Sequence, residues 1–406
     1  MRRVIPWRSV VTIAVWITNL TDTFAWAESL ESGAALFGWG GTMTEKMTMA
    51  DYIAESPAAM RSVCAREDEL LAPVLAEIAG KNLHRIWLVA CGSSRNACEC
   101  AEPFMRLCLG ADVDVHIVTP HTFTFYDHDV AEDDLVMVVT QSGWSTNAIE
   151  ALDAIHAAGG RAICLTGNVE ADAAKHADLV IDYGVGEELV GYVTKGVSVL
   201  AVFLCLLAIK VGGCPEHIAD LREAIDAAER VAAVSDAFVD RHFKGFTGMH
   251  MCYCIGSGGS MGAAAEAALK MGETVHVPSV RFEVEEYIHG PNLQLTPSYT
   301  LLFLDAGDAA SARTRQVYRA TREVTDGAFI AVPRSSDTGH QDDNALAVDA
   351  PFIPELASIV YLPFIQTASW RVSSALGSVK QHPLLKRFKK VAAAKTDGFV
   401  NYDDDE

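Results

Sequence analysis

The chain has 406 residues, of which 50% are hydrophobic and 21% are charged. This composition is typical of two or three globular domains with sizeable cores, and it excludes a disordered chain. Acidic residues number 53 against 32 Lys and Arg, so the formal net charge is −21. An acidic surface repels nucleic acids and anionic membranes, which excludes both as principal partners, whereas helix N-termini can still bind a small phosphorylated ligand.

Residues 1–48 are interpreted as a leader or an incorrectly assigned start. Arg2 and Arg3 precede an apolar run, and Ala25-Trp26-Ala27 resembles a signal-peptide cleavage site. The ten cysteines argue against export, because several lie within apolar runs, where free Cys behaves as a small hydrophobe. We therefore expect a reducing, cytoplasmic compartment. A zinc site at His250, Cys252 and Cys254 is an alternative to core packing, but the cysteine spacing disfavours it, so no metal is expected.

Residues 49–80 have the apolar spacing of a helix. Apolar strands are then predicted at 85–90, 113–118, 135–140, 161–166 and 179–182, with helices at about 96–109 and 147–158. Continuous apolar strands that alternate with helices indicate a parallel sheet covered on both faces. The apolar run 197–211 is short for a bilayer crossing and fits a buried helix.

The second half of the chain repeats this order. A helix near 216–234 precedes a strand at 251–255, a helix at 261–272 and strands at 300–304, 328–332 and 345–348. The fold class is therefore α/β, with two doubly wound domains of similar topology. The predicted boundaries are 49–212 for the first helix and domain, 213–245 for a helical linker, 246–392 for the second domain and 393–406 for a solvated, disordered acidic tail.

Two serine-containing turns follow strands of the first sheet. They are Gly92-Ser93-Ser94 and Gln141-Ser142-Gly143-Trp144-Ser145. Hydroxyls and free helix N–H groups at the carboxyl ends of parallel strands can hold an anion. The alternative for each turn is an ordinary serine N-cap. A P-loop pattern is missing, and the glycines at 256–259 do not complete a dinucleotide motif.

A further group of ionisable residues lies in the second domain. Glu266, Lys270 and Glu273 share one helix face, and His289 precedes Gly290-Pro291. A solvated Glu–Lys pair is the alternative. The helix is otherwise small and apolar, so one face must pack. A carboxylate and an imidazole near a phosphate site suit proton transfer between adjacent sugar carbons.

These motifs resemble those of the SIS (sugar isomerase) family. The similarity covers 49–392 and is to proteins with two SIS domains, namely the isomerase half of glucosamine-6-phosphate synthase and the fructosamine-6-phosphate deglycases. The family's phosphate turns resemble 91–94 and 140–145, and its Glu-to-Thr-Lys stretch resembles Glu188 to Thr194-Lys195. Its Ala-Leu-Lys-x-x-Glu helix and later His-Gly-Pro resemble 268–273 and 289–291.

The resemblance implies a role for each matching residue. Glu273 would move a proton between C1 and C2, Lys270 would hold Glu273 or a sugar hydroxyl, and His289, often supplied across a dimer interface, would assist ring opening or protonate the leaving amine. The implied substrate-binding residues are Gly92, Ser93, Ser94, Gln141, Ser142, Gly143, Ser145, Thr194 and Lys195. The resemblance therefore implies a homodimer that binds a sugar 6-phosphate and needs no cofactor.

The C-terminus departs from the synthase pattern. The lysine loop Arg-Asn-Leu-Ala-Lys is replaced by a stretch beginning His382-Pro383, which is similar to the deglycases and makes Lys386, Lys389 and Lys390 candidates for contact with the sugar. Trp144 replaces a small or acidic residue. We therefore expect a deglycase, deaminase or isomerase of an amino-sugar or fructosamine 6-phosphate. The alternatives are a synthase-like isomerase without a glutaminase domain and a non-catalytic module that binds sugar phosphate.

Overall fold

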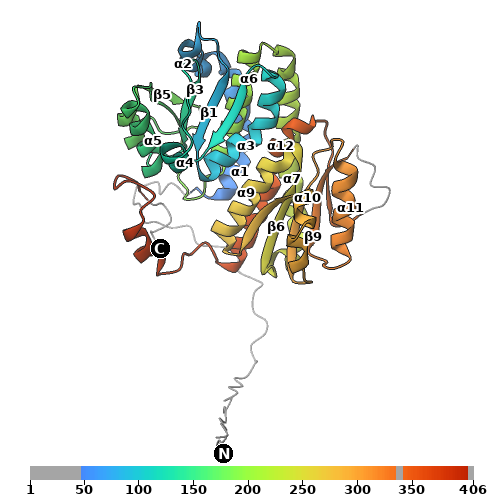
Figure 1. Ribbon diagram of the computed structural model, residues 1–406. Coiled ribbons are helices and arrows are strands. Elements are labelled where there is room, and N and C mark those ends of the chain that lie inside the picture. The colour runs from blue at the N-terminus through green and yellow to red at the C-terminus, as the bar shows by residue number, and fades with distance from the viewer. Residues whose placement is uncertain (1–46, 335–341, 401–406) are drawn as a thin grey trace, which may run out of the picture. The chain divides into compact units, whose positions relative to one another are not determined.

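The computed structural model describes residues 47–334 and 342–400. The predicted leader lies outside this part of the chain except for its last two residues. The described residues belong to one compact unit, which contains two five-stranded sheets with only parallel pairing. Figure 1 shows helices between the sheets and on their outer sides.

The first half begins with α1 (Met49–Ala65) and α2 (Glu67–Ile78), which replace the single predicted helix. It continues through β1 (Arg85–Ala90), α3 (Gly92–Leu109), β2 (Asp114–Val118), α4 (Pro120–Phe125), β3 (Leu135–Thr140), α5 (Thr146–Ala157), β4 (Ile163–Thr166) and β5 (Leu179–Asp182). The strand order is β2-β1-β3-β4-β5. The half ends in α6 (Lys195–Gly212).

The second half begins with α7 (Ile218–Arg241) and α8 (Phe243–Thr247). There follow β6 (Met251–Gly256), α9 (Met261–Lys270), a π-helical turn (Met271–Val275), β7 (Ser279–Glu283), α10 (Val284–Ile288), β8 (Tyr299–Leu304), α11 (Ser311–Arg322), β9 (Ala328–Pro333) and β10 (Ala345–Val348). The strand order of the second sheet is β10-β9-β8-β6-β7. Read from its β7 end, this is the same order as in the first sheet, with β7 in the place of β2 and β6 in the place of β1. The predicted α/β class with two similar parallel sheets is therefore confirmed. The chain ends in α12 (Ala357–Leu376) and α13 (Leu385–Val391).

The main core lies in the helical layer between the two sheets. One cluster of buried side chains joins the inner faces of both sheets through α3, α6, α7, α9 and α12, and smaller clusters lie under α4 and α5 and under α10 and α11. As predicted, the apolar helix α6 is part of this core. It is long and apolar enough to cross a membrane, but 83% of the span is buried inside the protein.

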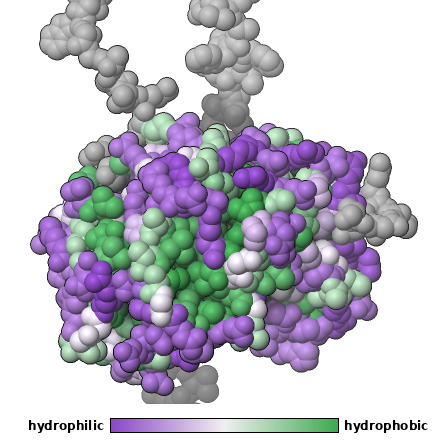
Figure 2. Space-filling model, turned by 90° about the horizontal axis from the view of Figure 1, so that it is seen from above, coloured by the Kyte–Doolittle hydropathy of each residue, from purple (hydrophilic) through white to green (hydrophobic). Residues whose placement is uncertain are grey.

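Apolar residues also gather on one face of the molecule. Figure 2 shows them in the middle of the face seen from above Figure 1, bordered by hydrophilic residues. Contiguous apolar areas of this kind are typical of interaction surfaces.

Candidate functional site

The first serine turn is built where β1 ends and α3 begins. Gly92 has a φ of +59°, a conformation that favours glycine. Ser93 and Ser94 follow in the first turn of the helix, which begins several residues earlier than predicted, and both are buried. The Oγ of Ser94 accepts a hydrogen bond from the Gln141 N–H at 3.4 Å. The two serines therefore lie beside backbone N–H groups that have no partner within the helix.

The second turn follows β3, which is hydrogen-bonded to β1, so the two turns lie at the same edge of the sheet. Gly143 has a φ of +71°, and a Cβ at this position would lie 2.4 Å from the Cβ of Ala171. Only glycine fits this conformation and this space. The structure thus brings together the predicted residues of both turns, from Gly92 to Ser145.

Lys395, which was not among the predicted site residues, binds the second turn. The Nζ of Lys395 donates to the Oγ of Ser142 at 2.7 Å and to the Oγ of Ser145 at 3.0 Å. Burial lowers the pKa of Lys395 below its ordinary value, although the neighbouring Cys91 opposes the shift. The predicted candidates Lys386, Lys389 and Lys390 instead lie on α13, which buries none of its residues.

The C-terminal segment packs onto the same turn. Ser145 and Lys395 form an isolated antiparallel bridge, and the Thr396 N–H donates to the Trp144 carbonyl oxygen at 2.9 Å. The expectation of a disordered tail is therefore wrong for residues 393–400, which contact the second turn although most of them are exposed, while residues 401–406 lie outside the described part.

Trp144 packs against this segment. A Cβ added to Gly398 would lie 2.4 Å from the Trp144 ring. Beside the ring is a cavity of about 390 Å³, which Gln141, Ser142, Glu187 and Phe399 help to line. The unusual tryptophan is explained by this contact, through which the tail covers one side of the turn.

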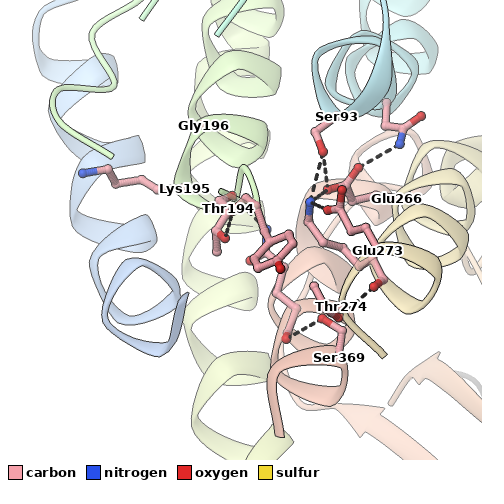
Figure 3. A network of polar contacts seen from close by, with 12 residues as sticks. Ser93, Thr194, Lys195, Gly196, Glu266, Glu273, Thr274 and Ser369 are labelled. Atoms are coloured by element: carbon pink, nitrogen blue, oxygen red, sulfur yellow. Dashed lines mark hydrogen bonds and ion pairs between the residues drawn. The ribbon is translucent and has the colours of Figure 1, made fainter. Parts of the chain in front are cut away.

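Lys270 is the centre of a buried network that connects the two halves of the chain. Its Nζ lies 3.1 Å from Glu266 Oε1, 2.5 Å from Glu273 Oε1 and 3.1 Å from Ser93 Oγ. The hydroxyl of Ser93 donates to Glu266 at 3.0 Å, and Asn96 donates to the other oxygen of Glu266 at 2.8 Å. Figure 3 shows Ser93 reaching this network from α3, Glu266 from α9 and Glu273 from the turn after α9.

The charges of this network are unequal, with two carboxylates around one ammonium group. Burial by itself lowers the pKa of Lys270, but Glu266 and Glu273 outweigh it and hold the pKa above its ordinary value. Lys270 and Glu266 are fully buried, whereas 30% of the Glu273 side chain is exposed. Glu273 is thus the carboxylate of the network that a ligand can reach, and it lies on a π-helical turn, a feature frequent at functional sites.

Thr194 and Lys195 do not join this network through their side chains. The Lys195 ammonium binds Glu55 at 2.9 Å and the Glu187 carbonyl oxygen at 2.9 Å, and Figure 3 shows it pointing toward α1, away from Ser93. The backbone N–H groups of both residues donate to Glu188. Burial raises the pKa of the Glu188 carboxyl, although these backbone groups oppose the shift. Glu188 in turn accepts a hydrogen bond from the Gln141 side chain at 3.3 Å. Thr194 and Lys195 therefore support the second turn indirectly, through Glu188.

His289 and Glu273 lie at opposite ends of the second sheet. Helix α9 starts after the carboxyl end of β6 and has 10 residues, so it carries Glu273 about 15 Å from that edge. His289 follows β7 and α10 and thus stays at the carboxyl edge, because β7 and β6 are parallel. Its side chain is exposed, and its Nδ1 donates to the Glu285 carbonyl oxygen at 2.7 Å. One chain therefore does not bring these two predicted residues together.

Among the described residues, no group of three or more His, Cys, Asp or Glu side chains is arranged to hold a metal ion. Cys252 and Cys254 are buried in β6 with their sulfur atoms 3.8 Å apart, whereas His250 is exposed. The ten cysteines are all free thiols.

Comparison with known proteins gives a domain match and related folds. Residues 80–209 match the model of the SIS domain. A glutamine–fructose-6-phosphate aminotransferase of Methanothermobacter thermautotrophicus is 25% identical over 348 residues, which cover 84% of this chain and 57% of the relative. The chain spans about half or less of the length of the first curated relatives it matches, with 39% for the one from Pyrobaculum aerophilum.

Solved structures extend the similarity over both sheets. A provisionally assigned phosphosugar isomerase from Clostridium difficile has a TM-score of 0.76 at 25% identity, with 86% of this chain and 99% of that chain covered. A glucosamine-6-phosphate deaminase from Thermotoga maritima shares the fold with a TM-score of 0.65 at 18% identity, and 82% of this chain and 97% of that chain are covered. Residues 80–209 thus match a SIS domain, and the two parallel sheets share the architecture of the tandem SIS domains in a solved phosphosugar isomerase structure.

Proposed function

We propose that the chain is an enzyme that transfers a proton between C1 and C2 of an amino-sugar or fructosamine 6-phosphate. The observation that carries the proposal is the double role of Ser93. It lies in the first serine turn, next to Ser94, and it also binds Lys270, which holds Glu273. A sugar whose phosphate is bound by the turns would extend toward an accessible carboxylate.

Each group then has a defined task in the proposed reaction. Ser94, Ser142, Ser145 and the turn N–H groups bind the phosphate, and Lys395 adds a positive charge when it is protonated. The Glu273 carboxylate removes the proton from one of the two carbons and returns it to the other, through an enediol or enolamine. Lys270 keeps Glu273 in place. His289 is assigned to ring opening or, in a deglycase or deaminase, to protonation of the amine that leaves after water adds to the C=N carbon, which ends as a carbonyl.

The His289 assignment requires a homodimer. Since Glu273 and His289 lie at opposite ends of the second sheet within one chain, a second copy has to supply the histidine. The apolar area in Figure 2 supports a surface that is covered in an oligomer. We also propose the domain boundaries 49–212 and 246–392, and a cytoplasmic location, which the free cysteines support.

Two other functions remain alternatives. One is an ammonia-dependent deaminase or synthase-like isomerase, which would use the same proton transfer on glucosamine 6-phosphate. The other is a module that binds sugar phosphate without chemistry. A binding module has no need for a carboxylate held by a buried lysine, so the Lys270–Glu273 pair favours an enzyme.

The substitution Glu273→Gln tests the proposal. We expect loss of turnover by at least about a hundredfold with almost unchanged ligand affinity, because the amide cannot accept the proton. The assay offers fructosamine 6-phosphates and glucosamine 6-phosphate and follows release of glucose 6-phosphate, fructose 6-phosphate or ammonia. Glu323→Gln, at an exposed position after α11, is the control. Normal turnover by the Glu273 variant would refute the proton-transfer role.

A further inference from the structure

The segment 384–391, called here the basic arm, carries an apolar helix face that the described residues of the chain leave exposed. It comprises Leu384 and α13, which buries none of its residues. Leu384, Phe388 and Val391 recur at i, i+4 and i+7, on one side of the helix. Phe388 is 64% exposed and Val391 is 91% exposed. Such a face normally packs against something, because exposed apolar surface is costly in water.

The arm also has a charge opposite to that of the rest of the chain. Residues 384–391 contain four of the 32 Lys and Arg residues and no Asp or Glu. The rest of the chain holds 28 Lys and Arg against 53 acidic residues, so its net charge is −25. The rest of the chain therefore carries a net charge that attracts the arm.

One exposed segment has the matching composition. Residues 125–133, called here the acidic segment, follow α4 and contain four acidic residues without Lys or Arg. Phe125 is 56% exposed and Tyr126 is 78% exposed. Beside the segment lies a cavity of about 540 Å³ to which Val130, Val136 and Ile155 contribute apolar walls. Exposed aromatic residues next to acidic ones and an apolar cavity fit an apolar helix with basic flanks.

We propose that the basic arm of one copy packs on the acidic segment of a second copy. Within one chain both surfaces are exposed, so they do not cover each other. In a two-fold dimer each copy gives an arm and receives one, which closes the assembly. An anionic membrane is disfavoured as the occupant because α13 has only 7 residues and the remaining charge would repel the bilayer.

The arm would couple the association of two copies to the serine turn that Lys395 binds. It ends four positions before Lys395, which binds Ser142 and Ser145. Packing of the arm on a second copy would therefore hold the chain that carries Lys395 into the second turn. The inference rests on the dimer of the proposed function but not on its reaction, so it is tested without a sugar.

The first experiment measures the dimer dissociation constant of the full chain by sedimentation equilibrium. The double variant Leu384→Ser/Phe388→Ser is expected to raise this constant about tenfold or more, since buried aromatic anchors dominate interfaces. Val234→Ser is the control, because Val234 on α7 is 47% exposed and lies outside both segments and outside the turn that carries His289. Circular dichroism verifies that the variants fold. An unchanged constant in the arm variant, or a monomeric wild type, would overturn the inference.

The second experiment exchanges charges between the two segments. Lys389→Glu/Lys390→Glu and Asp129→Lys/Glu132→Lys are each expected to weaken the homodimer, and a mixture of the two variants is expected to form heterodimers seen by native mass spectrometry. In that heterodimer both arm contacts join opposite charges. Random pairing of the two variants would contradict the inference. So would an unchanged dimer together with arm-dependent binding to phosphatidylglycerol vesicles, which would make a membrane the partner.

Discussion

Ser93 shows how one residue can connect the two halves of this chain. Its position in the first turn of α3 follows from the strand–turn–helix pattern, yet its hydroxyl bonds two residues of α9, Glu266 and Lys270. A serine N-cap, the alternative suggested by the sequence, would face its own helix. The hydroxyl instead satisfies a buried ion pair that would otherwise lack hydrogen bonds.

The buried ion pair leads to a prediction on stability. Lys270→Met is expected to lower the free energy of unfolding by about 3–5 kcal/mol, because it leaves the fully buried Glu266 without its charge partner. Urea denaturation measures the change. Arg61→Met is the matched control, since Arg61 is 43% exposed and its bridges to Asp226 and Glu229 are at the surface. It should cost less than about 1 kcal/mol. Equal losses in the two variants would mean that the Lys270 network contributes no more than a surface pair.

Lys395 leads to a prediction on pH. Its lowered pKa means that the amine loses its proton at a pH below the ordinary lysine range. Protonated Lys395 attracts phosphate, so the affinity for fructose 6-phosphate should fall as pH rises through this lowered pKa. The phosphate itself is fully ionised above about pH 7. Titration calorimetry between pH 7 and 10 measures the profile.

The variant Lys395→Met should bind fructose 6-phosphate about tenfold to a hundredfold more weakly at neutral pH and show no such fall, because the charge-assisted bond is gone. Lys244→Met, at an exposed position on α8, serves as the control and should keep the wild-type profile. Identical profiles for wild type and the Lys395 variant would show that this amine does not contact the phosphate.

At the scale of elements, the buried strands and the edge strands β2, β5 and β10 were predictable, whereas the edge strand β7 was not. The continuous apolar runs at 85–90 and 135–140 are β1 and β3, as predicted. Strand β7 was missed because it is half-exposed at the sheet edge and contains Arg281, which binds Glu99. None of the residues of β7 is buried, so this strand lacks the continuous apolar run that makes a parallel strand recognisable in sequence.

The candidate site was predictable where local pattern determines it. Turn glycines and serines after strands, and a Glu–Lys–Glu face on one helix, are local signals, and the structure brings Ser93, Lys270 and Glu273 together. The contact of Lys395 with Ser142 spans 253 positions along the chain, and no periodicity encodes it. Sequence also does not fix the direction of a side chain, which is why Lys195 was expected in the site although it points toward Glu55.

At the scale of the whole molecule, the separation of Glu273 and His289 leads to a prediction on activity. It concerns a heterodimer in which one chain lacks Glu273 and the other lacks His289. If each site takes Glu273 from one copy and His289 from the other, a heterodimer of Glu273→Gln and His289→Ala chains has one site with both defects and one intact site. We expect each homodimeric variant to be inactive and the heterodimer, purified with two different affinity tags, to recover about half of the wild-type activity per dimer. A heterodimer of Glu273→Gln with wild type provides the reference for a single intact site. If both residues acted within one chain, each mixed site would keep one defect and activity would not return.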